Sequence, residues 1–293
     1  MTHRMTTITT PLRYPGGKAK ALKKILPLIP NGFSEYREPF VGGGSVFIAV
    51  KQRNPNVLCR INDINRDVYC FWRAMKENPD ELIEAITQIK KVCKNGKNLH
   101  AKLAGANRNG VFGRALRFYV LNRITYSGTV DSGGYSSEAF EKRFTLSRIE
   151  ALRPLASLLK NVKITNESYE FLLSKEGRNT FIFLDPPYWK ARKSRLYGEN
   201  GNLSIVFNHR QFADKVRKCK HKWLITCDDS SLIRELFKPF SYVTPWKMRY
   251  GMNHKRIIGE ELFITNFTPE HFVQTKLASM SAANARKKTQ VAY

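Results

Sequence analysis

The sequence of 293 residues lacks any apolar run that reaches ~18 residues, so no membrane-spanning helix is expected. Its amino-terminal stretch has no apolar core of the kind that a secretory signal contains, which indicates the cytoplasm. The five cysteines form no C-x-x-C pair and the six histidines stand singly. The sequence therefore predicts reduced thiols and no metal site.

Acidic residues are scarce. The chain has 50 Lys and Arg against 24 Asp and Glu, which gives a formal net charge of +26 and an isoelectric point near 10.0. A surplus of this size exceeds what solubility requires and favours a polyanionic partner, because basic surfaces attract phosphate backbones whatever their sequence. A ribosomal or chromatin-type protein would share this charge, so the charge indicates the class of partner and not the activity.

Two segments carry much of the positive charge. Residues 86–130 contain nine Lys and Arg and no acid, and glycines, asparagines and aromatic residues interleave with them. Residues 190–256 contain sixteen Lys and Arg against five acids. Such runs are usually solvated faces, but a long run of one sign repels itself without a counter-anion. We therefore predict that both segments contact nucleic acid.

Neither of the two glycine motifs G-x-x-x-x-G-K-[ST] and G-x-G-x-x-G occurs in the chain. Two other glycine turns each precede a predicted helix, at residues 14–18 (YPGGK) and 38–47 (EPFVGGGSVF). In the first, backbone N–H groups and the Lys18 ammonium would face an anionic group. About 20 residues after the second, a predicted strand ends in Asp63, the place of the acid that binds ribose hydroxyls in nucleotide-binding βαβ units. The alternative interpretation is that both glycine segments are ordinary turns before helices and that Asp63 is a solvated acid at the end of a strand.

A short apolar run at residues 181–184 ends at Asp-Pro-Pro-Tyr, residues 185–188. The run has the length and composition of a buried strand in a parallel sheet. The prolines end it, because proline lacks an N–H group and restricts the residue before it. An acid and an aromatic ring are thereby held at the carboxyl end of a central strand, where open α/β sheets bind ligands.

This tetrapeptide suits methylation of an amino group on an aromatic ring. The lone pair of such a nitrogen is delocalised into the ring, so the amine is a poor nucleophile. The Asp185 carboxylate and the Pro186 carbonyl would each accept one N–H hydrogen bond and direct the lone pair at a methyl sulfonium, while Tyr188 stacks on the base. A turn whose prolines merely end the strand is the alternative for the tetrapeptide alone.

Hydrophobic periodicity and breaker residues outline the remaining elements. A strand is expected just before the glycine turn of residues 38–47, and residues 125–136 are expected to form a loop. Helices are predicted at 19–29, 68–89 (with a break at Asn78-Pro79), 114–123, 147–159, 167–174, 209–219 and 231–237, and strands at 58–63, 162–165, 181–184, 223–229 and 259–266, the last as an edge or hairpin strand.

Taken together, these segments resemble the Dam-type (α-group) DNA adenine-N6 methyltransferases. The resemblance spans roughly residues 11–266 in the family's order. One departure concerns residues 125–136, which lack the Asn-Val-Pro-Phe-Gly-type segment of GATC-specific members and so argue against GATC as the recognition sequence. The matching segments are residues 14–18 (YPGGK), 38–47 (EPFVGGGSVF), 62–65 (NDIN), 121–123 (LNR), 185–188 (DPPY), 226–229 (TCDD) and 259–262 (GEEL).

The resemblance implies an S-adenosylmethionine cofactor, a flipped target adenine and an α/β, Rossmann-like methyltransferase fold with an inserted, mostly helical DNA-recognition domain. Residues 1–66 and 165–275 are expected to form the catalytic domain, 67–164 the insert and 276–293 a disordered basic tail. The predicted site residues are catalytic Asp185, Pro186 and Tyr188; cofactor-binding Tyr14, Gly17, Lys18, Phe40, Gly42, Asp63, Ile64 and Asp185; and DNA-binding Arg114, Arg123, Tyr126, Lys190, Arg192 and Lys193.

The expected partner is double-stranded DNA, which would bring a cytoplasmic enzyme to the nucleoid as a monomer or weak dimer. Three alternatives stay open at this point: the same chemistry on RNA adenine, the same chemistry on a protein glutamine, or a nucleic-acid-binding homologue without activity. Enzymes that act on glutamine or ring amines often have Asn in place of Asp185, and the net charge disfavours a protein substrate.

Overall fold

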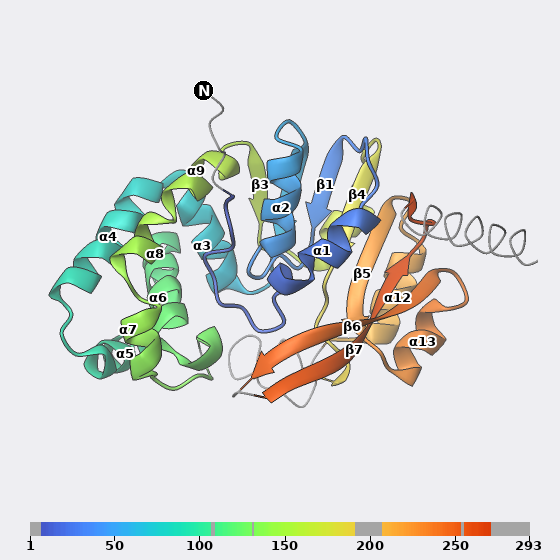
Figure 1. The fold of residues 1–293 in the computed structure, drawn as a ribbon. Helices are drawn as coiled ribbons and strands as arrows, with labels where there is room; N and C mark the ends of the chain where they lie inside the picture. The colour runs from blue at the N-terminus through green and yellow to red at the C-terminus, as the bar shows by residue number, and fades with distance from the viewer. Residues whose placement is uncertain (1–6, 107–108, 131, 191–206, 253–254, 271–293) are drawn as a thin grey trace, which may run out of the picture.

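A seven-stranded sheet of order β3-β2-β1-β4-β5-β7-β6 organises one half of the protein, in a computed structural model that describes residues 7–270 except 107–108, 131, 191–206 and 253–254 (Figure 1). Neighbouring strands from β3 to β5 are parallel, whereas β7 is antiparallel to both β5 and β6. The strands are β1 (Glu35–Glu38), β2 (Leu58–Asn62), β3 (Val162–Thr165), β4 (Thr180–Leu184), β5 (Lys222–Asp228), β6 (Tyr242–Met252) and β7 (Lys255–Thr265).

The direction in which the chain adds strands reverses between β1 and β4. From β1 the chain moves outward through β2 to β3, and it then returns to place β4 on the opposite side of β1. All five residues of β4 are buried, which confirms the predicted central strand. At such a reversal the connections after two neighbouring strands diverge to opposite faces and leave a crevice at their carboxyl ends. The fold thus places a ligand site beyond β1 and β4.

The helices α10 (Tyr169–Ser174), α12 (His209–Arg217) and α13 (Ser231–Phe237) pack on one face of the sheet. Their apolar side chains share a core with Ile182 and Leu184 of β4. The alternate residues of the same strand, Phe181 and Phe183, belong to the core on the other face. Because both faces of β4 are covered, its side chains on both faces must be apolar, and the continuous apolar run at residues 181–184 meets this need.

The core on the second face continues into a helical region without a break. It joins Tyr36 of β1 to side chains as distant as Ile83, Leu121 and Phe144, all of which are essentially inaccessible to solvent. Helix α3 packs along α6 and also contacts β3, so it connects the sheet to the other helices (Figure 1). The elements of this face and region are η1 (Lys18–Ala21), α1 (Leu22–Ile25), η2 (Leu26–Leu28), α2 (Ser45–Arg53), α3 (Arg66–Glu77), α4 (Pro79–Val92), α5 (Gly96–Ala104), α6 (Val111–Ile124), η3 (Tyr126–Gly128), α7 (Ser137–Lys142), α8 (Leu146–Glu150) and α9 (Arg153–Leu159).

Proline explains where predicted helices agree with the structure and where they do not. The break at Asn78-Pro79 is confirmed, because Pro79 is the first residue of α4. The single helix predicted at 147–159 is wrong: α8 ends at Glu150, and Pro154 stands in the first turn of α9. Residues 18–28 do form consecutive helical turns, but only α1 is α-helical, and the 3-10 segments η1 and η2 flank it, with Pro27 in the first turn of η2. Proline cannot continue a preceding helix, because it lacks an N–H group and its ring clashes with the previous turn.

The hairpin of β6 and β7 was only half predicted. Strand β7 is confirmed as a hairpin strand, because it pairs antiparallel with β6, and it is not an edge strand, because it also pairs with β5. Strand β6 was missed, since Pro245 interrupts the strand pattern. Proline is tolerated there because β6 is the last strand of the sheet, where one row of backbone groups has no partner strand.

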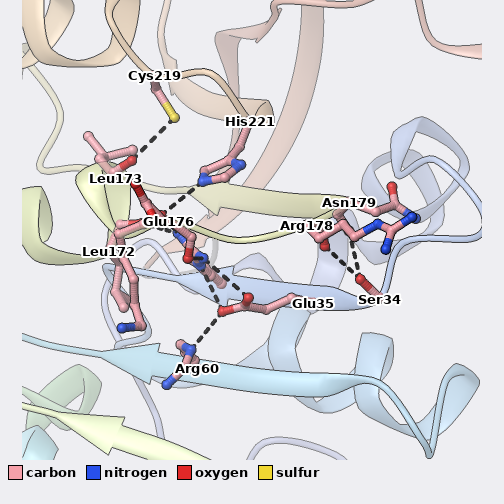
Figure 2. A network of polar contacts seen from close by, with 12 residues as sticks. Ser34, Glu35, Arg60, Leu172, Leu173, Glu176, Arg178, Asn179, Cys219 and His221 are labelled. Carbon is pink, nitrogen blue, oxygen red and sulfur yellow. Dashed lines mark hydrogen bonds and ion pairs between the residues drawn. The ribbon is translucent and has the colours of Figure 1, made fainter.

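A buried polar network ties the amino-terminal ends of the strands to the loop before β4 (Figure 2). Arg37, whose side chain is inaccessible, donates to both carboxylate oxygens of Glu35 and to the carbonyls of Leu172, Lys175 and Glu176. Burial raises the pKa of Glu35, but the hydrogen bonds from Arg37 and Arg60 outweigh it and hold that pKa below its ordinary value. The network lies at the opposite end of the sheet from the predicted site.

Within the described ranges, no helix is long and apolar enough to cross a membrane.

Candidate active site

A cavity of about 260 Å³ opens at the carboxyl ends of β1 and β4, where the strand order reverses. It brings together residues that are far apart in the sequence and that were predicted as one site. Its lining includes every predicted cofactor-binding and catalytic residue: Tyr14, Gly17, Lys18, Phe40, Gly42, Asp63, Ile64, Asp185, Pro186 and Tyr188.

The glycine turn after β1 forms one wall of the cavity together with the Tyr14 ring. Gly42 has a φ of 44°, and a Cβ atom on it would lie 2.7 Å from Tyr14 Cε1. Gly44 has a φ of 68°, and a Cβ there would lie 2.4 Å from the Trp72 ring of α3. Only glycine combines this backbone conformation with such close packing. Glycine at these positions therefore lets an aromatic wall lie directly against the turn.

Asp63 lies at the carboxyl end of β2, on a second wall of the cavity. Its Oδ2 accepts a hydrogen bond from the Gly42 N–H at 2.8 Å, and its Oδ1 accepts one from the Asn65 N–H at 2.9 Å. Burial raises the pKa of Asp63 to about 6, although the two N–H donors lower it. The next residue, Ile64, also lines the cavity and is half exposed, so it offers an apolar surface beside the acid.

Asp185 lines the cavity and is held in place by two donors. Lys18 Nζ lies 2.7 Å from Oδ2, and Thr226 Oγ1 of β5 donates to Oδ1 at 2.8 Å. The Lys18 ammonium also donates to the Gly16 carbonyl and lies 4.8 Å from the centre of the Tyr188 ring. The two halves of the predicted site, the amino-terminal glycine turn and the tetrapeptide after β4, are therefore joined by a buried ion pair.

The tetrapeptide is fixed along its whole length by neighbouring elements. His209 Nε2 lies 2.8 Å from the Pro187 carbonyl oxygen. Asp228 accepts hydrogen bonds from the backbone N–H groups of Trp189 and Lys190, at 2.7 and 3.3 Å. Among the described residues, none donates a hydrogen bond to the carbonyl of Pro186. A partly buried turn whose Pro186 carbonyl accepts no hydrogen bond from the described residues is the arrangement that the predicted chemistry requires.

Two buried acids beside the cavity were given no role by the sequence. Glu38 lines the cavity, accepts a hydrogen bond from the Tyr36 hydroxyl, and has a pKa that burial raises well above its ordinary value. Glu261 of β7 accepts a hydrogen bond from the Tyr188 hydroxyl at 3.0 Å, and burial raises its pKa to about 7. Both acids stand in segments that match the family, residues 38–47 and 259–262, but a sequence match does not reveal their buried partners.

The predicted DNA-binding residues differ in where the structure places them. Arg114 pairs with Asp67 at 2.7 Å, and Arg123 is 7% exposed with its guanidinium 5.4 Å from the Tyr119 ring centre. Arg114 thus links α6 to α3, whereas the contact of Arg123 with Tyr119 lies within α6, and the contact of both arginines with DNA stays a prediction. Tyr126 is 63% exposed and Lys190 is also exposed, whereas Arg192 and Lys193 lie outside the described residues.

All five cysteines are free thiols, as predicted. In the part of the chain that the structure describes, no group of three or more His, Cys, Asp or Glu side chains is arranged to hold a metal ion.

The strand order with an antiparallel β7, the glycine turn after β1, the acid after β2 and the Asp-Pro-Pro-Tyr turn after β4 define a Rossmann-like methyltransferase. Comparison with known families narrows this class. Residues 14–250 match the family of D12 class N6 adenine-specific DNA methyltransferases, and the chain belongs to that family. The family resemblance inferred from the sequence is therefore confirmed.

Three relatives illustrate the range of the similarity. The chain is 27% identical to the type II methyltransferase M1.LlaDCHI of Lactococcus lactis subsp. cremoris, over 87% of this chain and 94% of that protein. It is 22% identical to the type II methyltransferase M.CviBI of Paramecium bursaria Chlorella virus NC1A, over 89% and 98% of the two chains. It is 25% identical to the DNA adenine methylase of Salmonella typhi, over 78% and 83%.

Proposed function

We propose that this protein transfers a methyl group from S-adenosylmethionine to the N6 amino group of an adenine that is flipped out of double-stranded DNA. The observation that carries the proposal is the position of Asp185. Its carboxylate lines a cavity that Lys18 and Asp63 also line, so one site offers acceptors for an amine beside a place for a nucleoside cofactor.

The cavity residues fit S-adenosylmethionine. The close packing of Gly42 on Tyr14 makes a flat wall, and the buried Asp63 carboxylate stands where ribose hydroxyls are bound in related βαβ units. Ile64 and Phe40 line the same cavity as apolar surfaces for the adenine ring of the cofactor. When bound, the cofactor supplies an electrophilic methyl group on a sulfonium.

Positioning and charge complementarity are the main contributions of the protein to this transfer. Asp185 and the Pro186 carbonyl accept the two N–H bonds of the target amine, which localises its lone pair and aims it into the cavity. Lys18 and Thr226 hold the Asp185 carboxylate in one orientation, so its acceptor geometry exists before the substrate arrives. No cysteine nucleophile takes part, because the transfer is direct.

Tyr188 provides the surface on which the extruded base stacks. Extruding a base costs a few kcal/mol, which stacking and contacts to the DNA backbone offset. The Tyr188 ring is fixed by Glu261 at its hydroxyl and by Lys18 over its face. Its orientation is therefore already set when the base enters.

The basic helical region of residues 67–164 and the segment around residues 190–195 are the proposed contacts to DNA. Tyr126 and Lys190 are the exposed candidates within the described residues. Phosphate contacts of this kind are independent of base sequence and weaken as salt rises. The loop of residues 125–136 would then contribute to the choice of target, and GATC is not the target that we propose.

One experiment tests the proposal and separates it from its rivals. The purified chain is incubated with S-adenosylmethionine that carries a tritiated methyl group, in parallel with duplex DNA and with RNA, and the products are digested to nucleosides. The proposal predicts label in N6-methyldeoxyadenosine. Label only in RNA nucleosides would indicate the RNA alternative, and an absence of label from both would indicate a nucleic-acid-binding protein without activity.

A further inference from the structure

Asn122, near the end of α6, forms a hydrogen-bonded connection between two segments that are far apart in the chain. Its side chain is 1% exposed. Its Oδ1 accepts from the Arg13 N–H at 2.9 Å, and its Nδ2 donates to the Arg13 carbonyl at 2.7 Å and to the Gly128 carbonyl at 2.9 Å. One amide thereby pairs with both backbone groups of Arg13, as a neighbouring strand would, and with the loop after α6.

Two further contacts close this connection. The Arg13 guanidinium donates to the Thr125 carbonyl at 3.1 Å, so the side chain repeats the link that the backbone makes. Gly128 has a φ of 74°, and a Cβ atom on it would lie 2.3 Å from the Arg13 carbonyl oxygen. The segment at Arg13 and the loop at residues 125–128 therefore lie against each other with no room for a side chain between them.

The two joined segments serve different parts of the proposed site. Arg13 directly precedes Tyr14, whose ring forms the cavity wall against Gly42. Gly128 is two residues from Tyr126, which is 63% exposed and is our candidate for contact with DNA. The loop is itself braced, because Thr129 Oγ1 donates to the Tyr126 carbonyl and the Tyr126 N–H donates to the Gly134 carbonyl. The buried Asn122 amide is thus the main hydrogen-bonded link between this loop and the segment that carries the cofactor wall, and the Arg13 guanidinium adds a second.

We propose that Asn122 is a positioning residue that couples the binding of DNA to the binding of the cofactor. This inference rests on the proposed function, since it takes the cavity as the cofactor site and the loop at Tyr126 as a DNA contact. A ligand that orders either segment orders the other, so each ligand binds more tightly when the other is present. Such coupling is reciprocal: both ligands must change each other's affinity by the same factor.

The test measures this factor from both sides. Calorimetry gives the Kd of S-adenosylmethionine with and without a short duplex whose target adenine already carries the methyl group, so that no transfer occurs during the titration. It also gives the Kd of this duplex with and without cofactor. For the unaltered chain we expect each affinity to rise about tenfold when the other ligand is present, within the range typical of coupled sites. Asn122→Ala leaves the Arg13 and Gly128 groups unpaired, and the factor should fall severalfold, since only the Arg13 guanidinium bond to Thr125 then remains.

Asn95→Ala is the matched control. Asn95 also accepts a backbone N–H with its side-chain oxygen, from Asn98 at 3.0 Å, but this bond caps α5, and Asn95 does not line the cavity. This variant should keep the full coupling factor. If Asn122→Ala does not fold, as judged by circular dichroism, Arg13→Ala takes its place, because it removes only the guanidinium bond to Thr125 and should reduce the factor.

The outcomes separate this inference from the proposed function. An unaltered chain that binds cofactor and DNA independently, or a folded Asn122→Ala variant with an unchanged factor, would overturn the inference and leave the function standing. A loss of coupling in Asn95→Ala as well would also overturn it, because general destabilisation would then be the cause. A chain that binds neither cofactor nor DNA would overturn the proposed function itself.

Discussion

The raised pKa of Asp63 predicts that cofactor affinity falls at mildly acidic pH. In the free protein burial raises this pKa to about 6, so the carboxyl takes up a proton as the pH falls through that value. Ribose hydroxyls donate hydrogen bonds, and the ionised carboxylate is the stronger acceptor. Binding therefore competes with protonation, and the affinity is highest above the pKa of the free protein.

The size of the effect follows from the same pKa. Between about pH 7.5 and about pH 5, Asp63 changes from almost fully ionised to about nine-tenths protonated, so the Kd for S-adenosylmethionine should rise about tenfold, or ~1.4 kcal/mol. Isothermal calorimetry over this range measures the change directly. The titration is performed on the chain without DNA, so that only the cofactor cavity contributes.

Asp63→Asn is the variant that isolates this group. It keeps the size of the side chain and removes its titration. The variant should bind the cofactor more weakly at neutral pH, by about 1.5–3 kcal/mol for the loss of charged hydrogen bonds. Its Kd should also lose the dependence on pH. A wild-type Kd that is constant over the range, or an equal slope in Asp63→Asn, would refute the assignment of Asp63 to the cofactor.

Three further variants test other parts of the account. Gly42→Ala should weaken cofactor binding and lower the free energy of unfolding by about 1–2 kcal/mol or more, because it adds a clash in the cavity wall to the cost of a positive φ. Arg37→Ala should lower the free energy of unfolding by about 3–5 kcal/mol in urea, because it removes the buried donor to both oxygens of Glu35, which then keeps only Arg60, and to three backbone carbonyls. Burial raises the pKa of Glu261 in the folded protein to about 7, so the wild type should lose on the order of 3 kcal/mol of stability as the pH rises from about 5 to about 8. Glu261→Gln has no group that titrates there, so its stability should not fall over this range.

The chain supplies controls for these variants. Gly32→Ala has the same backbone cost as Gly42→Ala, since its φ is 74°, but nothing lies near its Cβ, so cofactor binding should be unaffected. Arg60→Ala removes a partly exposed partner of the same acid and should cost much less than Arg37→Ala. Equal effects within either pair would contradict the explanation given. If the stability of Glu261→Gln changed with pH in the same way as that of the wild type, the explanation given for Glu261 would be contradicted.

The parts of the fold that could be predicted are those whose cause is local. Residues 181–184 are predicted as a buried central strand by their own composition, and Pro186 and Pro187 fix where it ends. Asp63 and the glycine turn could be placed by their spacing along one βαβ unit. Where the local signals conflicted, prediction failed: Pro245 concealed β6, and the apolar pattern of 147–159 concealed the break before Pro154.

The contacts that complete the site connect distant residues, and no local pattern indicates them. Asn122 and Arg13 are 109 positions apart, and Tyr188 and Glu261 are 73 apart. The polar character of each residue is visible in the sequence, but its partner is fixed only when the sheet and the helices have packed. The motif LNR at residues 121–123 could therefore be assigned to the family by resemblance, while the connection made by Asn122 required the structure.

The central claim is that Asp185 orients the target amine, and Asp185→Ala tests it most directly. The variant and the wild type are compared in two assays on the same duplex: transfer of a tritiated methyl group, and binding measured by fluorescence anisotropy. The account predicts that transfer is abolished while the Kd for DNA is largely unchanged. Near-normal transfer in a folded Asp185→Ala variant would contradict it.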